Sequence, residues 1–263
     1  MPVDPTPRPA HTRGRRVRPA LRLIQLLILF LAALVMTAAA DDGAIAVARF
    51  SAATAGAPLP VEWQPLAFPK IPRQTEYRLV SVGDSVVVRA DSRGAASGLV
   101  RRLRVDLKQF PLLRWRWQVT NLIDQSDVRR KDGDDYPARL YITFEYDPER
   151  TSLSQRLQYR LGRLLFGDIP IAAISYIWET RTPVGAILPS AYTGRTQMIV
   201  VESGPEHVGQ WVAEERDVFA DYRRAFGAEP PAVNAVAIMT DTDNTGASAT
   251  AFYGDIEFRA RPH

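Results

Sequence analysis

Cysteine is absent from this chain of 263 residues, and histidine occurs only at His11, His207 and His263. Without cysteine, the chain has no disulfide, no cysteine nucleophile and no lipid anchor on an N-terminal cysteine. A single internal histidine excludes a multi-histidine zinc site and leaves any Ser-His-Asp triad dependent on His207. Any hydrolysis is therefore expected to depend on carboxylates.

The body of the chain also lacks an excess of positive charge. The 33 Lys and Arg outnumber the 29 Asp and Glu, but six arginines and one acid, Asp4, lie in the first 40 residues. The rest has 27 basic residues against 28 acidic ones, so no electrostatic argument supports binding to nucleic acid. No Walker loop or dinucleotide fingerprint follows a predicted strand, which argues against nucleotide-dependent chemistry.

The first 40 residues have the three zones of a secretory signal peptide. A polar start precedes an apolar run over residues 23–36, and Ala38 and Ala40 supply an A-x-A-like cleavage site. We predict a signal peptide over residues 1–40, with an uncleaved anchor in the inner membrane as the alternative. In both cases the body is expected in the periplasm, or secreted, and it contacts the membrane only through this segment.

The remaining pattern predicts a flexible spacer over residues 41–60, rich in Ala and Gly, and one domain over residues 61–263. Short apolar or alternating runs separated by turn residues predict an all-β fold, an antiparallel β-sandwich of jelly-roll type. Periodicity and stop signals add two peripheral helices, at residues 152–166 and 218–226. The ten predicted strands cover residues 76–82, 85–90, 98–106, 112–119, 138–146, 172–179, 197–202, 210–216, 234–240 and 250–258.

Two acidic loops carry oxygen ligands for a hard cation. Residues 241–246 place Asp241, Asp243 and Asn244 before a turn glycine, a composition suited to a structural calcium ion. The loop is not an EF-hand, because Phe252 occupies the position of the bidentate Glu. The alternative is a pair of Asx turns with no cofactor. The second loop, residues 131–136, places adjacent carboxylates before a strand, where they can bind a cation or pair with arginine.

Carboxylates and strand-borne polar residues are the candidates for chemistry and recognition. For a carboxylate-dependent hydrolase or lyase, the candidate catalytic residues are Asp134, Asp135, Glu145, Glu179 and Glu202. In the strand over residues 114–117, Trp115 and Trp117 share one face and the arginines share the other. The tryptophans are expected in the core, although stacking on sugar rings is the alternative. The candidate ligand-binding residues are Arg114, Arg116, Tyr136, Arg139, Tyr141 and Arg216.

Four motifs together resemble a known family. They are the segments over residues 112–117, 134–139, 215–222 and 237–256. In order and spacing the chain is similar to the bacterial exported family catalogued as domain-of-unknown-function family 3047. The resemblance implies a one-domain exported protein without an assigned activity. The last strand is also similar to the closing strand of many carbohydrate-binding jelly rolls, which is an analogy at the level of the fold.

These observations give a leading hypothesis and two alternatives. The leading hypothesis is a periplasmic β-sandwich that binds carbohydrate or cell-envelope glycan through a polar sheet face or edge loops. The first alternative is a carboxylate-dependent glycoside hydrolase or lyase. The second is a non-catalytic envelope scaffold, which a large exposed apolar patch without a cleft would favour.

Overall fold

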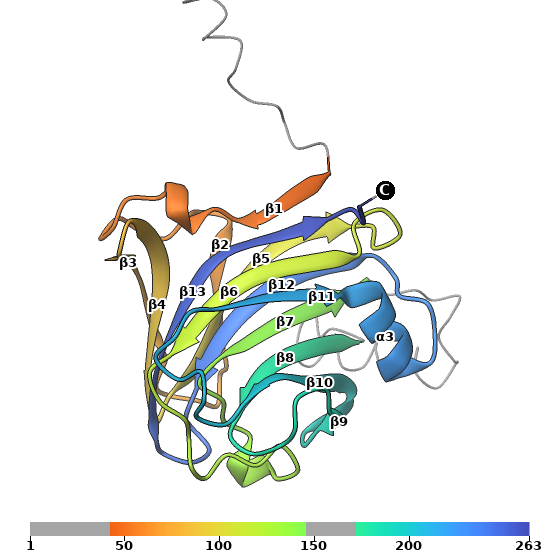
Figure 1. Cartoon of the computed structure of the whole chain (residues 1–263). Helices are drawn as coiled ribbons and strands as arrows, with labels where there is room; N and C mark the ends of the chain where they lie inside the picture. The colour runs from red at the N-terminus through yellow and green to blue at the C-terminus, as the bar shows by residue number, and fades with distance from the viewer. Residues whose placement is uncertain (1–42, 146–171, 263) are drawn as a thin grey trace, which may run out of the picture. The chain divides into compact units, whose positions relative to one another are not determined.

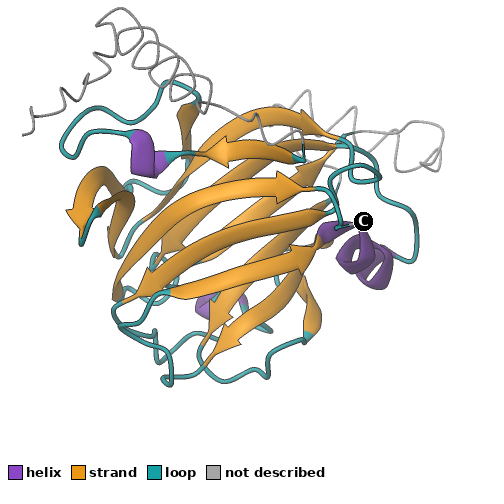
Figure 2. Cartoon of the chain, turned by 45° about the horizontal axis from the view of Figure 1, so that its top comes forward, coloured by secondary structure: helices purple, strands orange, loops and turns teal. Residues whose placement is uncertain are grey.

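The computed structural model describes residues 43–145 and 172–262, which lie in one compact unit, Gly43–His263. These residues form two stacked sheets (Figures 1 and 2). The first is a six-stranded sheet in the order β11-β6-β13-β4-β3, and β1 also pairs with β13. Its strands are β1 (Ala44–Ala48), β3 (Glu76–Val82), β4 (Ser85–Arg93), β6 (Leu112–Val119), β11 (Val212–Asp217) and β13 (Ser248–Arg259).

The second sheet has seven strands in the order β2-β5-β12-β7-β8-β10-β9. All its neighbouring pairs are antiparallel except β8 with β10, which is parallel. The chain passes repeatedly between the two sheets, and this confirms the predicted all-β, jelly-roll-type sandwich. The strands are β2 (Trp63–Ala67), β5 (Ala96–Val105), β7 (Arg139–Phe144), β8 (Ala173–Glu179), β9 (Ile187–Ser190), β10 (Thr193–Ser203) and β12 (Val233–Asp241).

The core lies between the sheets and follows the period-two alternation of the strands. Trp115 and Trp117 of β6 face the other sheet, where their rings lie 5.3 Å from Tyr176 and 6.0 Å from Trp178 of β8. All four side chains are buried, so the prediction that the tryptophans belong to the core is confirmed. On β7, Leu140, Ile142 and Phe144 point into the same core and leave the intervening polar side chains on the outer face.

The predicted spacer over residues 41–60 is wrong for much of its length. β1 pairs antiparallel with β13, and a 3-10 turn, η1 (Phe50–Ala52), follows it. Val47 and Phe50 are fully buried, and Phe50 packs against Trp63 at 5.4 Å. The composition of this segment did not indicate a strand, because its alanines contribute little apolar surface. The strand forms because the main chain of β13 offers hydrogen-bonding partners, which only the tertiary structure brings close.

One α-helix, α3 (Val218–Phe226), is present among the described residues, with the predicted bounds. The Asp217 side chain accepts a hydrogen bond from Ala220 N at 2.9 Å at its start, and Gly227 ends it with a left-handed φ of 68°. α3 lies at one end of the sandwich (Figure 1). The second predicted helix, over residues 152–166, falls outside the described residues. Within the described part of the chain, no helix is both long and apolar enough to cross a bilayer.

Two glycines of the seven-stranded sheet give a test of sheet packing. A Cβ added at Gly98 would lie 2.9 Å from the main-chain oxygen of Ile238, whereas one at Gly194 of β10 would meet no atom within 4 Å. We expect Gly98→Ala to lower the free energy of unfolding by roughly 1–3 kcal/mol. Gly194→Ala should change it by less than about 1 kcal/mol. Urea unfolding of both variants checks this, and equal losses would show that backbone approach does not govern β5.

Candidate functional site

A groove crosses the outer face of the seven-stranded sheet and has a volume of about 480 Å³. Strand register brings its floor together: Ala235 and Ala237 of β12 lie opposite Thr143 and Tyr141 of β7. Alanines make the floor low, because neighbouring positions with larger side chains rise around it. Further lining comes from the segment after β2 (Phe68, Ile71), the end of β9 and the turn after it (Ser190, Tyr192), the β12–β13 loop (Asp243, Asn244), and Asp134.

A buried guanidinium organises the acidic end of this groove. Arg139 of β7 is 2% exposed and binds Asp241 of β12 through both carboxylate oxygens, with Nε–Oδ1 at 2.7 Å. Its other terminal contacts are the main-chain oxygen of Asp134 and the hydroxyl of Tyr141, the latter at 3.1 Å. The guanidinium also lies over the Tyr136 ring at 4.2 Å. Arg139 is thus committed to holding two strands and a loop together.

Asp135 likewise holds the β12–β13 loop in place. Its carboxylate is fully buried and accepts hydrogen bonds from Asn244 N at 3.2 Å, and from Thr245 N and Thr245 Oγ1 at 2.6 Å each. These bonds attach the β12–β13 loop to the segment that precedes β7. The two acidic loops that the sequence singled out therefore meet in space.

The meeting of the loops concentrates negative charge. Carboxylate oxygens of Asp135, Asp241 and Asp243 all lie within 4.8 Å of one another, and Asp134 lines the same groove. Burial raises the pKa of Asp241 to about 8, against the opposing effect of the Arg139 guanidinium. Burial also raises the pKa of Asp134 and of Asp243, and in both cases the charge of Asp135 adds to the shift. The carboxylates thus crowd around a single buried guanidinium.

The rim of the groove carries an aromatic side chain that sequence reasoning missed. Tyr192 is 55% exposed, yet its hydroxyl accepts a hydrogen bond from Asn244 Nδ2 at 2.7 Å and donates to Lys131 O at 3.2 Å. The Lys131 ammonium lies 5.5 Å from the ring centroid. An exposed aromatic ring that these contacts hold in place can stack against the apolar face of a ligand. Its signal in the sequence was a tyrosine isolated between Ser190 and Gly194.

Three predicted ligand-binding residues, Tyr136, Arg139 and Tyr141, belong to this groove end. Tyr136 lies beneath Arg139 and is fully buried, so the ring supports the guanidinium. Tyr141 stands on the floor, where its hydroxyl receives a hydrogen bond from Arg139. Of these three, Tyr141 is the side chain that lines the groove without being fully buried.

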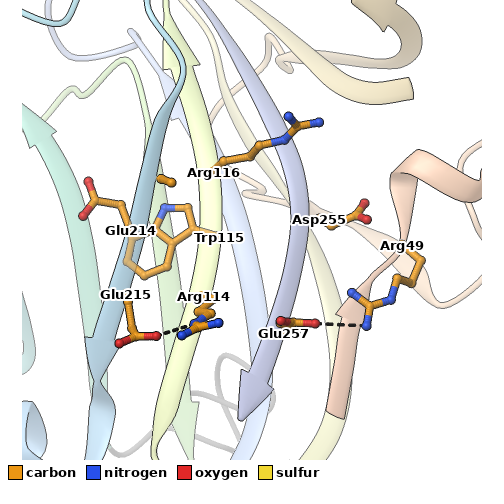
Figure 3. A pocket seen from close by; sticks show the side chains of 9 residues that line it. Arg49, Arg114, Trp115, Arg116, Glu214, Glu215, Asp255 and Glu257 are labelled. Carbon is orange, nitrogen blue, oxygen red and sulfur yellow. Dashed lines mark hydrogen bonds and ion pairs between the residues drawn. The ribbon is translucent and has the colours of Figure 1, made fainter. Parts of the chain in front are cut away.

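Arg114 and Arg116 lie on the opposite side of the molecule, on the outer face of the six-stranded sheet (Figure 3). A shallow hollow of about 600 Å³ lies there, where Arg114 pairs with Glu215, and Arg49 pairs with Glu257 at 3.0 Å. Arg116 donates to Ser85 Oγ at 3.0 Å and lies 4.8 Å from the Trp211 ring centroid. The arginines on this outer face are therefore bound to side chains of neighbouring segments.

The other candidate carboxylates do not join the groove. Glu145 is exposed and pairs with Arg104 at 2.9 Å. Glu179 is fully buried and accepts hydrogen bonds from the main-chain N–H groups of Arg181 and Thr182. Glu202 bonds His207 Nδ1 at 3.0 Å. The five predicted acids thus divide into a converging pair, Asp134 with Asp135, and three separate residues.

The candidate residue Arg216 does not share the outer sheet face of Arg139 and Tyr141, because it belongs to β11 of the six-stranded sheet. Glu214 lies opposite Trp115 in the β11–β6 register, on the side that faces the core, and in Figure 3 its carboxylate points away from that of Glu215. Arg216 binds Asp221 at 2.8 and 2.9 Å and lies near the Tyr176 ring. β11 is the edge strand of its sheet, where polar side chains can find partners outside the sheet, as Arg216 does in Asp221.

Comparison with known proteins gives the family. The model of the family described as "Protein of unknown function (DUF3047)" matches residues 61–257, and the chain belongs to that family. No curated protein matches the chain. Two solved structures show distant similarity, at 10% identity each. One is the glycoside hydrolase domain of Endo-D from Streptococcus pneumoniae R6, with a TM-score of 0.32 over 76% of this chain and 22% of that one.

The other is endoglucanase 3 of Trichoderma harzianum, from family GH12, with a TM-score of 0.37 over 78% of this chain and 100% of that one. The present chain thus spans about a fifth of the Endo-D structure and the full length of the endoglucanase.

The buried Arg139–Asp241 pair generates a stability prediction. Asp241→Asn removes the charge that balances a buried guanidinium, so we expect the free energy of unfolding to fall by about 3–5 kcal/mol. The matched control is Glu145→Gln, which breaks the exposed Arg104–Glu145 pair and should cost less than about 1 kcal/mol. Urea unfolding at about pH 9, above the pKa of about 8 of Asp241, measures both, and similar losses would contradict the structural role assigned to the buried pair.

Glu214 generates a prediction about pH. Burial and then the neighbouring Glu202 carboxylate raise the pKa of Glu214 to about 7, above its ordinary value of 4.5. Glu214 therefore stays protonated to a higher pH in the folded state than in the unfolded chain. Its contribution to the free energy of unfolding is complete below about pH 4.5 and is lost as pH rises through about 7.

The free energy of unfolding of Glu214→Gln should not show this loss. Between pH 4.5 and pH 8, the variant should therefore gain roughly 1–3 kcal/mol of stability relative to the wild type. Unfolding by urea across this pH range measures the effect. Glu215→Gln is the matched control, because Glu215 is exposed and pairs with Arg114. A pH profile of Glu214→Gln that parallels the wild type would refute the assignment.

Proposed function

We propose that this protein binds carbohydrate, with cell-envelope glycan as the ligand class, in the groove on the outer face of the seven-stranded sheet. The observation that carries the proposal is the combination of a low alanine floor with an exposed, hydrogen-bonded tyrosine at the rim. Sugars present apolar ring faces and polar edges, and such a groove offers partners for both.

The lining of the groove combines two kinds of chemistry. Leu66, Phe68 and Ile71 contribute apolar surface, and Asp243, Asn244 and Tyr141 contribute oxygen and nitrogen atoms. Arg102 and Thr143 supply further polar groups along the floor. A saccharide laid across the sheet could stack on the apolar surface and Tyr192 while its hydroxyls bond to the polar groups. The hollow of Figure 3 is a weaker candidate for the ligand site, because many of its charged side chains already form ion pairs with one another.

A scaffold without a ligand site is less well supported. The strongly exposed large apolar residues among those described are Val61, Val184 and Tyr192, and they lie in separate segments. Scattered apolar residues of this kind are ordinary on a protein surface. The proposed location is the periplasm, or the medium after secretion, or an inner-membrane anchor facing the periplasm, for which the N-terminal sequence is the support.

A carboxylate-dependent glycoside hydrolase or lyase is the second candidate function. It is favoured by the position of Asp134 and Asp243 on the groove, where they could act on a bound saccharide. Asp241 is less suited to such a role, because both of its oxygens bind Arg139. Two carboxyl groups that flank a glycosidic bond are the general requirement for this chemistry.

Tyr192 provides the test of the binding proposal. On an array of bacterial-envelope oligosaccharides, followed by calorimetry with the retained glycan, we expect Tyr192→Ala to weaken affinity by about tenfold or more, through loss of stacking. Tyr192→Phe keeps the ring and should lose less. Trp211→Ala, which removes an aromatic ring on the six-stranded sheet, is the matched control and should bind as the wild type does.

Three outcomes decide between the hypotheses. Absence of any glycan binding by the wild type would overturn the proposal, and loss in Trp211→Ala without loss in Tyr192→Ala would move the site to the six-stranded sheet. Release of shorter saccharides from the retained glycan, abolished in Asp134→Asn with binding preserved, would identify the protein as a hydrolase or lyase.

A further inference from the structure

We propose that the acidic end of the groove is a binding site for a calcium ion, held by the carboxylates of Asp135, Asp241 and Asp243 with Asp134 at its side. Oxygen ligands of one calcium ion lie about 2.3–2.6 Å from it, so two of them are separated by at most about 5 Å. The carboxylate oxygens of the three aspartates lie within 4.8 Å of one another and meet this condition without movement of the backbone.

A second observation comes from Asp134. This residue is 6% exposed, lines the same groove as Asp241 and Asp243, and its Oδ1 atom accepts no hydrogen bond from the residues that the structure describes. The Arg139 Nη1 atom lies 3.5 Å away and already donates to the Tyr141 hydroxyl. A buried carboxylate oxygen without a hydrogen bond is costly, and a nearby cation would satisfy it.

The charge balance points the same way. Four carboxylates, those of Asp134, Asp135, Asp241 and Asp243, gather around the Arg139 guanidinium, whose hydrogen bonds are already committed. Buried charges are normally paired or bound to a metal. A divalent cation would offset the excess negative charge that a single guanidinium leaves.

The donor set selects the kind of ion. Carboxylates and the nearby Asn244 side chain offer hard oxygen atoms, and the chain has no cysteine to supply sulfur. Hard oxygen ligands suit calcium and magnesium rather than zinc or copper. Flexible coordination at longer distance favours calcium, because magnesium demands a tight octahedron near 2.0–2.1 Å.

The position of the site defines what the ion would do. Asp135 belongs to the segment before β7, whereas Asp241 and Asp243 belong to β12 and the loop after it. An ion shared among them would join the same two segments that Asp135 already links through Asn244 N and Thr245 N. The ion would therefore fix the acidic wall of the groove. This inference stands independently of the glycan proposal.

Terbium luminescence tests the site directly, because Tyr141 and Tyr192 line the same groove as Asp241 and Asp243, and a nearby tyrosine sensitises a bound lanthanide. For the full chain freed of metal by chelation, we expect one terbium ion per molecule, displacement by calcium, and a rise of several degrees in Tm on adding calcium. Asp243→Asn should weaken terbium and calcium binding at least tenfold. Asp243 is partly exposed and lies in a loop, so this variant should fold.

Controls separate the site from general effects of charge. Asp84→Asn, in the exposed β3–β4 turn, removes the same charge elsewhere and should bind terbium as the wild type does. Asp134→Asn tests the oxygen without a hydrogen bond and should also weaken binding. The inference fails if the wild type binds no stoichiometric terbium or calcium, or if Asp243→Asn and Asp84→Asn bind equally. Glycan binding by chelated protein is measured separately, so failure of one proposal is distinguishable from failure of the other.

Discussion

The buried ion pair between Arg139 and Asp241 is the interaction on which the candidate site depends. It joins β7 to β12 at the point where two loops leave the sheet, and its remaining donors hold the main chain at Asp134 and the hydroxyl of Tyr141. A guanidinium suits this task because its planar array of donors can contact several acceptors in fixed directions. Breaking the pair would leave a buried charge, and both loops would lose their common attachment.

The groove and the acidic cluster follow from one sheet face with uneven side-chain sizes. Alanines on β12 make a low floor, while charged residues gather where β12 ends and β7 begins. On the outer face of the six-stranded sheet, by contrast, arginines and acids pair across neighbouring strands. Paired charges satisfy one another on that surface, whereas the groove keeps carboxylates and an exposed tyrosine available to a ligand.

Much of the fold was predictable, because alternation and turn residues report local structure. All ten predicted strands exist, and those at residues 76–82 and 112–119 have the observed bounds. α3 was predicted from Gly227 as its stop signal, with Pro230 and Pro231 behind it. Three strands were not predicted: β1, β2 and β9 are short and complete sheets formed by other strands. Their structure depends on partners distant in sequence, and local patterns carry no information about them.

The sequence by itself determined the class of fold, the ten principal strands and the two acidic loops as places of interest, since side-chain periodicity and loop composition are local properties. Tertiary structure decided which residues meet: it joined Asp135 to the β12–β13 loop and placed Arg114 and Arg116 on the other sheet. It also turned Glu214 toward the core. Convergence of distant loops is set by strand order and register, which arise from pairing and packing across the whole chain.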